Sequence, residues 1–227
     1  MVFSLDKVVP WGRSYIEYVA MFSLSKDDLT KKLLGCSDGP ASFNCNITKT
    51  GGKIVSVDPL YKFTKSHIKQ RIEETFSVVI AQTKQNLHEF KWENIRSVEE
   101  LAEIPNRAMN EFLMDYEPGS KQGRYVAAGL PSLPFRDKAF DLAPCSHFLF
   151  LYSELFSFDF HLQVIEELCR IAKEVRMFPL LELGSRKSRH LDGTMDYFNS
   201  HGFDITIQQV NYEFQKGGNK MLVLKSK

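Results

Sequence analysis

The stretch from Lys31 to Pro59 decides the fold, and it reads KKLLGCSDGPASFNCNITKTGGKIVSVDP. A short apolar strand runs into small residues at positions 35, 37 and 39, a helix follows, and two glycines end that helix before a second strand. Small residues in such a turn let the backbone approach a ligand closely. The order of strand, tight turn, helix and strand predicts one βαβ unit of a parallel sheet.

A carboxylate ends the second strand of this unit. Asp58 follows the turn by about 20 residues, the separation at which an acidic side chain at the end of a second strand meets a ribose diol. The turn itself is imperfect, because Gly35 and Gly39 are glycines but Ser37 holds the middle place. Together these features predict a nucleotide or nucleoside site, and the alternative is a plain crossover with a tight turn.

Strands and helices alternate through the rest of the chain. We expect strands at 124–128, 138–147 and 175–183, with Pro144 ending or bulging the second of them, because proline lacks the N–H that a central strand needs. Helices are predicted at 161–172 and 188–201, and residues 204–214 and 221–224 predict a closing hairpin around Gly217-Gly218-Asn219. This pattern is typical of an α/β fold with a mostly parallel sheet, helices on both faces and one antiparallel end.

Residues 62–124 separate the second strand from the third, which is far more than one crossover helix needs. The segment carries an apolar stripe at helical spacing from Ile68 to Ile80, and a second helix is expected to end at residues 117–120. An insertion that leaves the sheet at a carboxyl end begins beside the ligand, so we expect a helical cap over the substrate side of the pocket. A structural cover and a homodimer face are the alternatives.

The composition of the chain argues against nucleic-acid-binding, membrane-spanning and metal-binding proteins. The 227 residues, 43% of them hydrophobic, suit a single domain over 1–227. The formal net charge is +1, and the insertion holds ten basic and ten acidic residues, so a nucleic-acid partner is not expected. No apolar run approaches the ~20 residues that cross a bilayer, and no signal peptide is evident. Four cysteines without CxxC spacing predict no metal site and a reducing, cytoplasmic compartment.

The glycine-containing turn, the second strand that ends on Asp58 and the run before the fourth strand resemble motifs of class I, Rossmann-like S-adenosylmethionine-dependent methyltransferases. LGCSDG at 34–39 is similar to the glycine-rich first motif of that family, VSVDP at 55–59 to its second, and LPFRDKAFDL at 133–142 to the run before its fourth strand. The resemblance covers about residues 30–60 and 124–227 and implies a seven-stranded sheet. More narrowly, GPASF at 39–43 and CSHFLFLY at 145–152 look like a bacterial group of uncharacterised methyltransferase-like proteins.

The resemblance implies S-adenosylmethionine as cofactor, a small-molecule methyl acceptor, and a set of site residues. The expected cofactor-binding positions are Gly35, Cys36, Ser37, Gly39, Asp58, Pro59, Leu60, Gly129, Leu130 and Ser146. Arg13 joins them as a fork for a carboxylate from an N-terminal flap, although a solvated Arg13 is equally compatible with the sequence. The chain departs from the family at Leu33 and Gly129, where acidic residues are usual.

His147 follows the fourth strand and is the candidate catalytic base, because a neutral imidazole accepts a proton near pH 7. Its alternative role is to cap the next helix or to hydrogen-bond at the sheet rim. Weaker candidates near the strand ends are Tyr152, Glu154, Arg186 and His190. Two other classes stay open: a non-catalytic S-adenosylmethionine-binding protein, which the departures suggest, and a nicotinamide-dependent oxidoreductase, which the glycine turn and Asp58 alone would fit.

Overall fold

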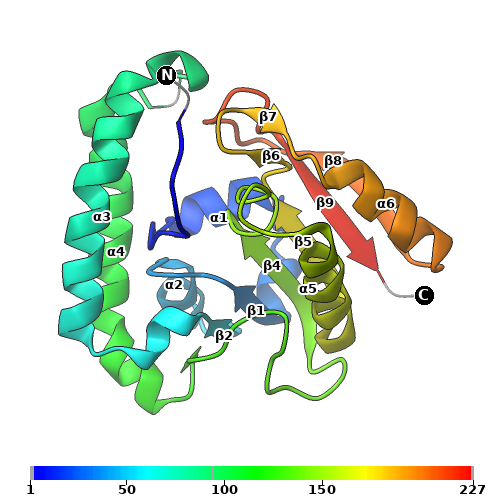
Figure 1. Ribbon diagram of the computed structural model, residues 1–227. Coiled ribbons are helices and arrows are strands. Elements are labelled where there is room, and N and C mark those ends of the chain that lie inside the picture. The colour runs from blue at the N-terminus through cyan, green and yellow to red at the C-terminus, as the bar shows by residue number, and fades with distance from the viewer. Residues whose placement is uncertain (1–2, 94, 226–227) are drawn as a thin grey trace.

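One seven-stranded sheet forms the centre of the computed structural model, which describes residues 3–93 and 95–225 (Figure 1). The strand order is β3-β2-β1-β4-β5-β9-β8, and the first five strands in this order are mutually parallel. β9 lies antiparallel between β5 and β8. The strands are β1 Lys32–Cys36, β2 Lys53–Val57, β3 Tyr125–Val126, β4 Phe140–Ser146, β5 Ala172–Phe178, β8 Asp204–Gln209 and β9 Lys220–Lys225. The predicted mostly parallel sheet with a closing antiparallel hairpin is therefore confirmed.

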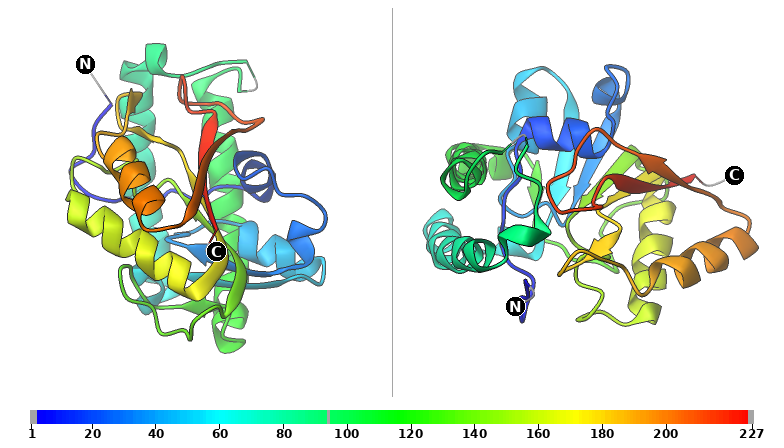
Figure 2. Two further views of the ribbon diagram at one scale, coloured as in Figure 1. Left: turned by 90° about the vertical axis from the view of Figure 1, so that its right-hand side faces the viewer. Right: turned by 90° about the horizontal axis from the view of Figure 1, so that it is seen from above.

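Helices cover both faces of the sheet, as predicted (Figure 2). Helices α1 Tyr15–Met21 and α2 Phe43–Lys49 pack on one face, and α5 Phe158–Ile171 and α6 Leu191–Ser200 pack on the other. Neighbouring residues of a strand point to opposite faces, so Leu33 joins the α1–α2 core and Leu34 joins the α5–α6 core. A two-stranded ribbon, β6 Leu181–Glu182 and β7 Arg186–Lys187, follows β5.

The segment between β2 and β3 forms two long helices that stand beside the sheet (Figure 1). They are α3 Lys65–Gln85 and α4 Val98–Lys121, with short 3-10 turns at Pro59–Lys62 and Leu87–Glu89. The expected end of the second helix was wrong, because α4 continues through Pro118 to Lys121. A proline this close to a helix end removes only one backbone bond. None of the described helices is long and apolar enough to cross a membrane.

Pro144 neither ends nor bulges its strand, contrary to the expectation from sequence. β4 continues to Ser146, and Pro144 stands in register with Arg176 of β5. On the other side, the register with β1 pairs Leu142 and Cys145 but leaves Pro144 without a partner in that strand. The missing N–H thus falls where β4 has no paired residue in β1, so the ladder to β5 is kept.

The turn after β1 is held by a close fit between Gly35 and Asp38. A Cβ atom added at Gly35 would lie 1.8 Å from Oδ2 of Asp38, so the carboxylate occupies the space that any other residue would fill. Ser37 and Gly39 both have left-handed backbone, with φ of 51° and 52°. The serine is the costlier of the two, because a Cβ atom disfavours positive φ.

We expect Gly35→Ala to destabilise the protein by about 1–3 kcal/mol, since the new methyl group displaces a buried, hydrogen-bonded carboxylate. Urea unfolding measures the change in the free energy of unfolding. The same substitution in an Asp38→Ala background should cost much less, because the obstructing carboxylate is gone. Equal costs in the two backgrounds would contradict this account of the turn.

Candidate functional site

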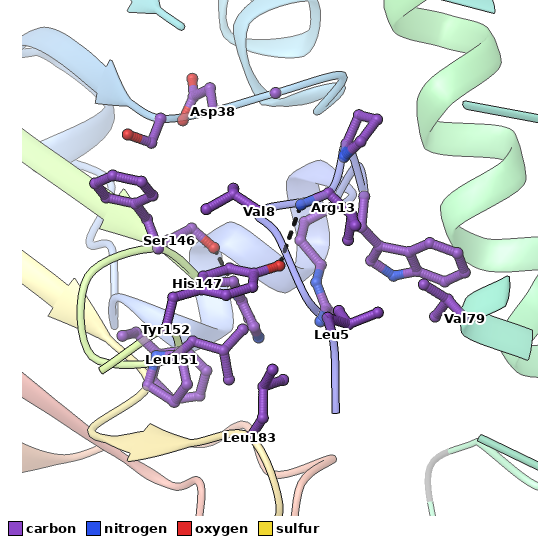
Figure 3. Close-up of a pocket in the computed structure, with 18 of the residues that line it drawn as sticks. Leu5, Val8, Arg13, Asp38, Val79, Ser146, His147, Leu151, Tyr152 and Leu183 are labelled. Atoms are coloured by element: carbon purple, nitrogen blue, oxygen red, sulfur yellow. Dashed lines mark hydrogen bonds between the residues drawn. The ribbon is translucent and has the colours of Figure 1, made fainter. Parts of the chain in front are cut away.

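A cavity of about 490 Å³ lies at the carboxyl ends of β1, β2 and β4 (Figure 3). The chain leaves β1 toward β2 on one side and β4 lies on the other, so the strand order reverses at this point. Ligands of open α/β sheets bind in the crevice at such a switch point. Ser37 after β1, Asp58 after β2 and His147 after β4 all line the cavity.

The N-terminal segment, residues 3–13, runs between the α3–α4 pair and the sheet and forms part of the cavity wall (Figures 1 and 2). The amide of Val9 donates to the Tyr152 hydroxyl at 3.3 Å, which Figure 3 marks, and the amide of Phe3 donates to Glu89 Oε1 at 2.9 Å. Trp11 stacks on Phe76 of α3 at a centroid distance of 5.5 Å. This segment therefore contacts both the helical pair and the loop after β4.

The far end of the α3–α4 pair is attached to the loop between β8 and β9. The amide of Lys91 donates to the carbonyl of Phe214 at 2.7 Å, and the amide of Lys216 donates to the carbonyl of Glu89 at 2.9 Å. Phe90 stacks on Phe214 at 4.8 Å in the same place. The other end of the pair packs on the sheet edge in a separate apolar cluster. The pair is therefore fixed to the body at both ends.

Between these attachments, the middle of α3 faces the cavity through Arg71, Val79 and Thr83. Three aromatic residues of the insertion serve to attach it, whereas Phe63 and Phe90 line the cavity. Phe112 and Tyr116 pack in the cluster at the sheet edge, and Trp92 packs near Phe214 in the cluster at the far end. These three side chains are not part of the cavity wall among the residues that the structure describes.

Asp58 is oriented by two backbone amides at the end of β2. Its Oδ2 accepts from the amide of Gly39 at 2.9 Å, and its Oδ1 accepts from the amide of Leu60 at 2.7 Å. Burial raises the pKa of this carboxyl above its usual 3.8, while the two amide hydrogen bonds act in the opposite direction. Each carboxylate oxygen keeps a further lone pair for a ligand. Close by, Pro59 packs on Gly129, where a Cβ atom would lie 2.9 Å from the proline ring.

Most positions that the sequence indicated lie together around this cavity. They are Arg13, Ser37, Gly39, Asp58, Pro59, Leu60, Gly129, Leu130, Ser146 and His147. Two of the expected positions are elsewhere. Gly35 faces the Asp38 carboxylate, and Cys36 is wholly buried in the core, where its thiol contacts the carbonyl of Leu34 at 3.6 Å. β1 extends through Cys36, which places that side chain inside the sheet's packed face and off the cavity wall.

Asp38 also lines the cavity, although it is not among the site residues expected from the sequence. Its side chain is buried with 5% exposure. Oδ1 accepts from the Tyr18 hydroxyl at 2.7 Å, and Oδ2 accepts from the Ser56 hydroxyl at 2.6 Å. Burial is the main cause that raises the pKa of this carboxyl to about 6, and the charge of Asp58 adds to it. Two features of the sequence could have indicated Asp38. It is an acidic residue within a turn of small residues, and Leu33 stands at the position where related motifs carry an acidic residue.

A series of hydrogen bonds runs from Arg124 at the sheet edge to Asp38. Arg124 donates from Nη1 to Asn44 Oδ1 at 2.6 Å, and Asn44 donates from Nδ2 to Ser56 Oγ at 3.0 Å. Because the serine oxygen already accepts from the amide, its own proton is directed to Asp38. Arg124 is held in turn by two bonds to Asp115 at 2.7 and 2.8 Å. The network therefore presents an ordered donor to the Asp38 carboxylate.

His147 sits at the carboxyl end of β4 in left-handed backbone, with φ of 49°. Its amide donates to the carbonyl of Phe178 at 2.6 Å, and its Nδ1 lies 2.8 Å from Ser146 Oγ. Burial, and then the charge of Arg13, hold the pKa of this imidazole well below its usual 6.5. The ring is therefore neutral at pH 7. Non-glycine residues in strained backbone cluster at functional sites, which makes His147 and Ser37 candidates on geometry.

Arg13 brings a buried cation to the same wall. Its Nη1 lies 3.2 Å from Glu17 Oε1 and 3.3 Å from the Tyr212 hydroxyl. Nη2 donates to none of the residues that the structure describes. The carbonyl of Arg13 accepts from the amide of Ser42, so the segment before α1 lies directly on the turn after β1.

Among the described residues, one of the four weaker candidates for catalytic residues lines the cavity and three do not. Tyr152 lines the cavity, whereas Glu154, Arg186 and His190 do not appear on its wall within the described part of the chain. His190 lies with Nε2 3.2 Å from the carbonyl of Phe156, and Glu154 pairs with Arg189. No group of three or more His, Cys, Asp or Glu side chains within 3–93 and 95–225 is arranged to hold a metal ion.

The raised pKa of Asp38 predicts a pH-dependent cost of folding. A carboxyl that binds its proton more tightly when folded stabilises the protein below about pH 4, and that contribution is lost as the pH rises through about 6. The shift from 3.8 to about 6 corresponds to ~3 kcal/mol. We therefore expect Asp38→Asn to gain stability relative to the wild type between about pH 4 and about pH 7.

Urea unfolding of both proteins across this pH range measures the difference. Asp204→Asn is the matched control, because Asp204 is exposed on β8. A pH-independent difference for Asp38→Asn would contradict the raised pKa.

Comparisons with known proteins give one relative in sequence and several neighbours in structure. No family model matches the chain. The uncharacterized protein MJ0045 of Methanocaldococcus jannaschii is 32% identical over 223 residues, which are 98% of each chain. Magnesium protoporphyrin IX methyltransferase (ChlM) from Synechocystis PCC 6803, with bound SAH, superposes with a TM-score of 0.51 at 12% identity over 93% of this chain and 81% of that chain. The mitomycin 7-O-methyltransferase MmcR gives a TM-score of 0.48 at 8% identity, over 94% and 54%.

The expected resemblance is supported at the level of the fold and unsupported at the level of the narrower group. The class I methyltransferase fold is confirmed, since structural neighbours with this sheet are S-adenosylmethionine-dependent methyltransferases. The narrower expectation of a bacterial group has no support, because the relative found in sequence is archaeal. At 98% coverage and 32% identity the relationship spans the whole described fold, including the α3–α4 pair. The chain, with its class I methyltransferase fold, belongs to the family of the uncharacterized archaeal protein MJ0045.

Proposed function

We propose that this protein is a methyltransferase that uses S-adenosylmethionine to methylate a small molecule. The observation that carries the proposal is the placement of Asp58. Its carboxylate lies at the end of β2, is oriented by the amides of Gly39 and Leu60, and faces the cavity at the switch point of the sheet. A carboxylate in that place is suited to the two hydroxyls of a ribose.

The rest of the wall fits a nucleoside with an amino acid end. Pro59, Leu60 and Leu130 offer apolar surface beside Asp58 for a base, and Gly129 allows the two loops to approach. The cofactor would supply an electrophilic methyl group, so the chain has mainly to bind and align the two reactants. The balanced charge of the insertion supports a small molecule over a nucleic acid as acceptor.

His147 is the group placed to take a proton from the acceptor. It borders the cavity, and its neutral ring has a lone pair available at pH 7. Because its pKa is well below the usual value, it is a weak base and suits an acceptor that loses its proton easily. The same weakness favours the second candidate function, a protein that binds the cofactor without turnover. Transfer of a labelled methyl group to any acceptor would decide between them.

The α3–α4 pair encloses the acceptor side of the cavity in this proposal. Its middle faces the cavity while both ends are attached to the body, so we call residues 62–124 a cap. A cap fixed in this way opens by local motion of its centre and of residues 3–13, which lie beneath it, more readily than by swinging as a whole.

Asp58→Ala should lose hydrogen bonds to both ribose hydroxyls, each worth roughly 1.5–3 kcal/mol. We therefore expect the affinity for S-adenosylhomocysteine to fall by at least tenfold in calorimetry. Asp58→Asn keeps the shape of the side chain and should lose affinity too, whereas Asp204→Ala should bind as the wild type does. Unchanged affinity in both Asp58 variants would show that the site is assigned wrongly.

Hydrogen exchange tests the cap. With S-adenosylhomocysteine bound, amides in residues 71–83 and 3–13 should exchange more slowly than in the free protein, because both segments border the ligand. Residues 109–116 serve as an internal reference, since they pack in the cluster at the sheet edge. Equal protection of 71–83 in both states would leave the insertion as a structural cover.

A further inference from the structure

A carboxylate lies among aromatic rings at the far end of the cavity, where the cap meets the loop between β8 and β9. Glu89, in the turn between α3 and α4, lines the cavity and is buried with 7% exposure. Phe3, Phe90 and Phe214 line it too. Phe3 meets Phe90 edge-on at a centroid distance of 5.9 Å, and Phe90 stacks on Phe214 at 4.8 Å. The amide of Phe3 donates to Glu89 Oε1 at 2.9 Å, so these contacts place the carboxylate and the three rings together.

Glu89 has no cation beside it among the described residues. Its Oε1 accepts from the amide of Phe3, and its Oε2 accepts from none of the residues that the structure describes. Lys91, two positions further along the chain, pairs instead with Glu213 at 2.9 Å. A buried carboxylate with a single neutral donor is costly, because that donor replaces only part of its lost hydration. Since Glu89 lines the cavity, a positive group of a ligand can reach it there.

Gln215 adds a second acceptor to this end of the wall. Its Nε2 donates to the carbonyl of Glu182 at 2.9 Å, which leaves its Oε1 without a donor in the described residues. The backbone holds Gln215 near Glu89, because Gln215 forms a bridge with Phe90 and the amide of Lys216 donates to the carbonyl of Glu89. An ammonium group donates to several such acceptors at once, and the faces of aromatic rings attract it as well. This end of the cavity is therefore suited to a positive group.

The far end is separate from the place proposed for the cofactor. Leu60, beside the proposed ribose site, packs in the cluster at the sheet edge, whereas Glu89 follows α3. The 21 residues of α3 lie between them in the chain and span about 30 Å as a helix. Figure 3 shows apolar side chains on the cavity wall, among them Leu5, Val79 and Leu183. A molecule that reaches from Glu89 toward the cofactor thus needs an apolar body.

We propose that the methyl acceptor is an apolar small molecule with an ammonium-type cationic group, and that Glu89 binds this group among the rings of Phe3, Phe90 and Phe214. The proposal rests on the proposed function and names the chemical class of its acceptor. The cationic group anchors the molecule at the far end of the cavity. A different atom of the same molecule receives the methyl group, because the cofactor lies toward the other end.

Three probes with one skeleton and different end groups test the charge preference in calorimetry. They are 4-phenylbutylamine, 4-phenylbutanol and 4-phenylbutyrate, which are cationic, neutral and anionic at pH 7. The wild type should bind the amine at least tenfold more tightly than the butyrate, with the alcohol between them. Equal affinities for the amine and the butyrate, or no binding of the amine at millimolar concentration, would overturn the proposal without the use of any variant.

The variants then assign the preference to its residue. Glu89→Gln removes the charge but keeps an oxygen for the amide of Phe3, so it should bind the amine no more tightly than the alcohol. Glu93→Gln is the matched control and should keep the wild-type preference, because Glu93 is exposed on the same connection and lies off the cavity wall in the described part of the chain. A Glu89→Gln protein that still prefers the amine would show that Glu89 is assigned wrongly.

Titrations with S-adenosylhomocysteine separate this inference from the proposed function. The amine should bind equally well when S-adenosylhomocysteine saturates the protein, because the two ligands occupy different ends of the cavity. Loss of amine binding under those conditions would place the amine in the cofactor site and overturn the inference, while the proposed function stands. If S-adenosylhomocysteine itself does not bind, the proposed function fails first, and the acceptor role assigned here fails with it.

Discussion

The carboxylate of Asp38 occupies the space that a side chain at Gly35 would fill, and the hydroxyls of Tyr18 and Ser56 hold it there. This contact joins three parts of the molecule: α1 through Tyr18, β2 through Ser56, and the turn after β1. No described cation pairs with this carboxylate, and a buried charge without a cation destabilises the fold. The turn is thereby shaped around a buried, hydrogen-bonded carboxylate.

A second constraint is the position of residues 3–13. They pass between the sheet and the α3–α4 pair, and they bring Arg13 onto the turn after β1 through the bond from Ser42 to its carbonyl. The bond between Val9 and Tyr152 ties the same segment to the loop after β4. The cavity is thus enclosed by chain segments far apart in sequence, which is how a mostly apolar pocket comes to contain a few placed polar groups.

The backbone is strained at the ends of β1 and β4, which border the proposed site. Ser37 after β1 and His147 after β4 both adopt left-handed backbone, although neither is glycine. Such conformations persist only where surrounding contacts hold them, as the bond from the amide of His147 to Phe178 does. Because the strands are adjacent in the sheet, the two residues meet at one cavity, and this brings a candidate base to the ligand turn.

The sequence by itself determined the sheet, the helices on both faces, and the positions of Asp58, Gly39 and His147 at strand ends. These follow from local periodicity and from the rule that parallel strands end at one edge. Only the tertiary structure decided that Cys36 points into the core, that β4 continues past Pro144, and that Asp38 is buried with no cation beside it among the described residues. The reason is physical: burial, register and the pairing of charges depend on contacts between segments distant in sequence, such as Tyr18, Ser56 and Arg124, which no local pattern encodes.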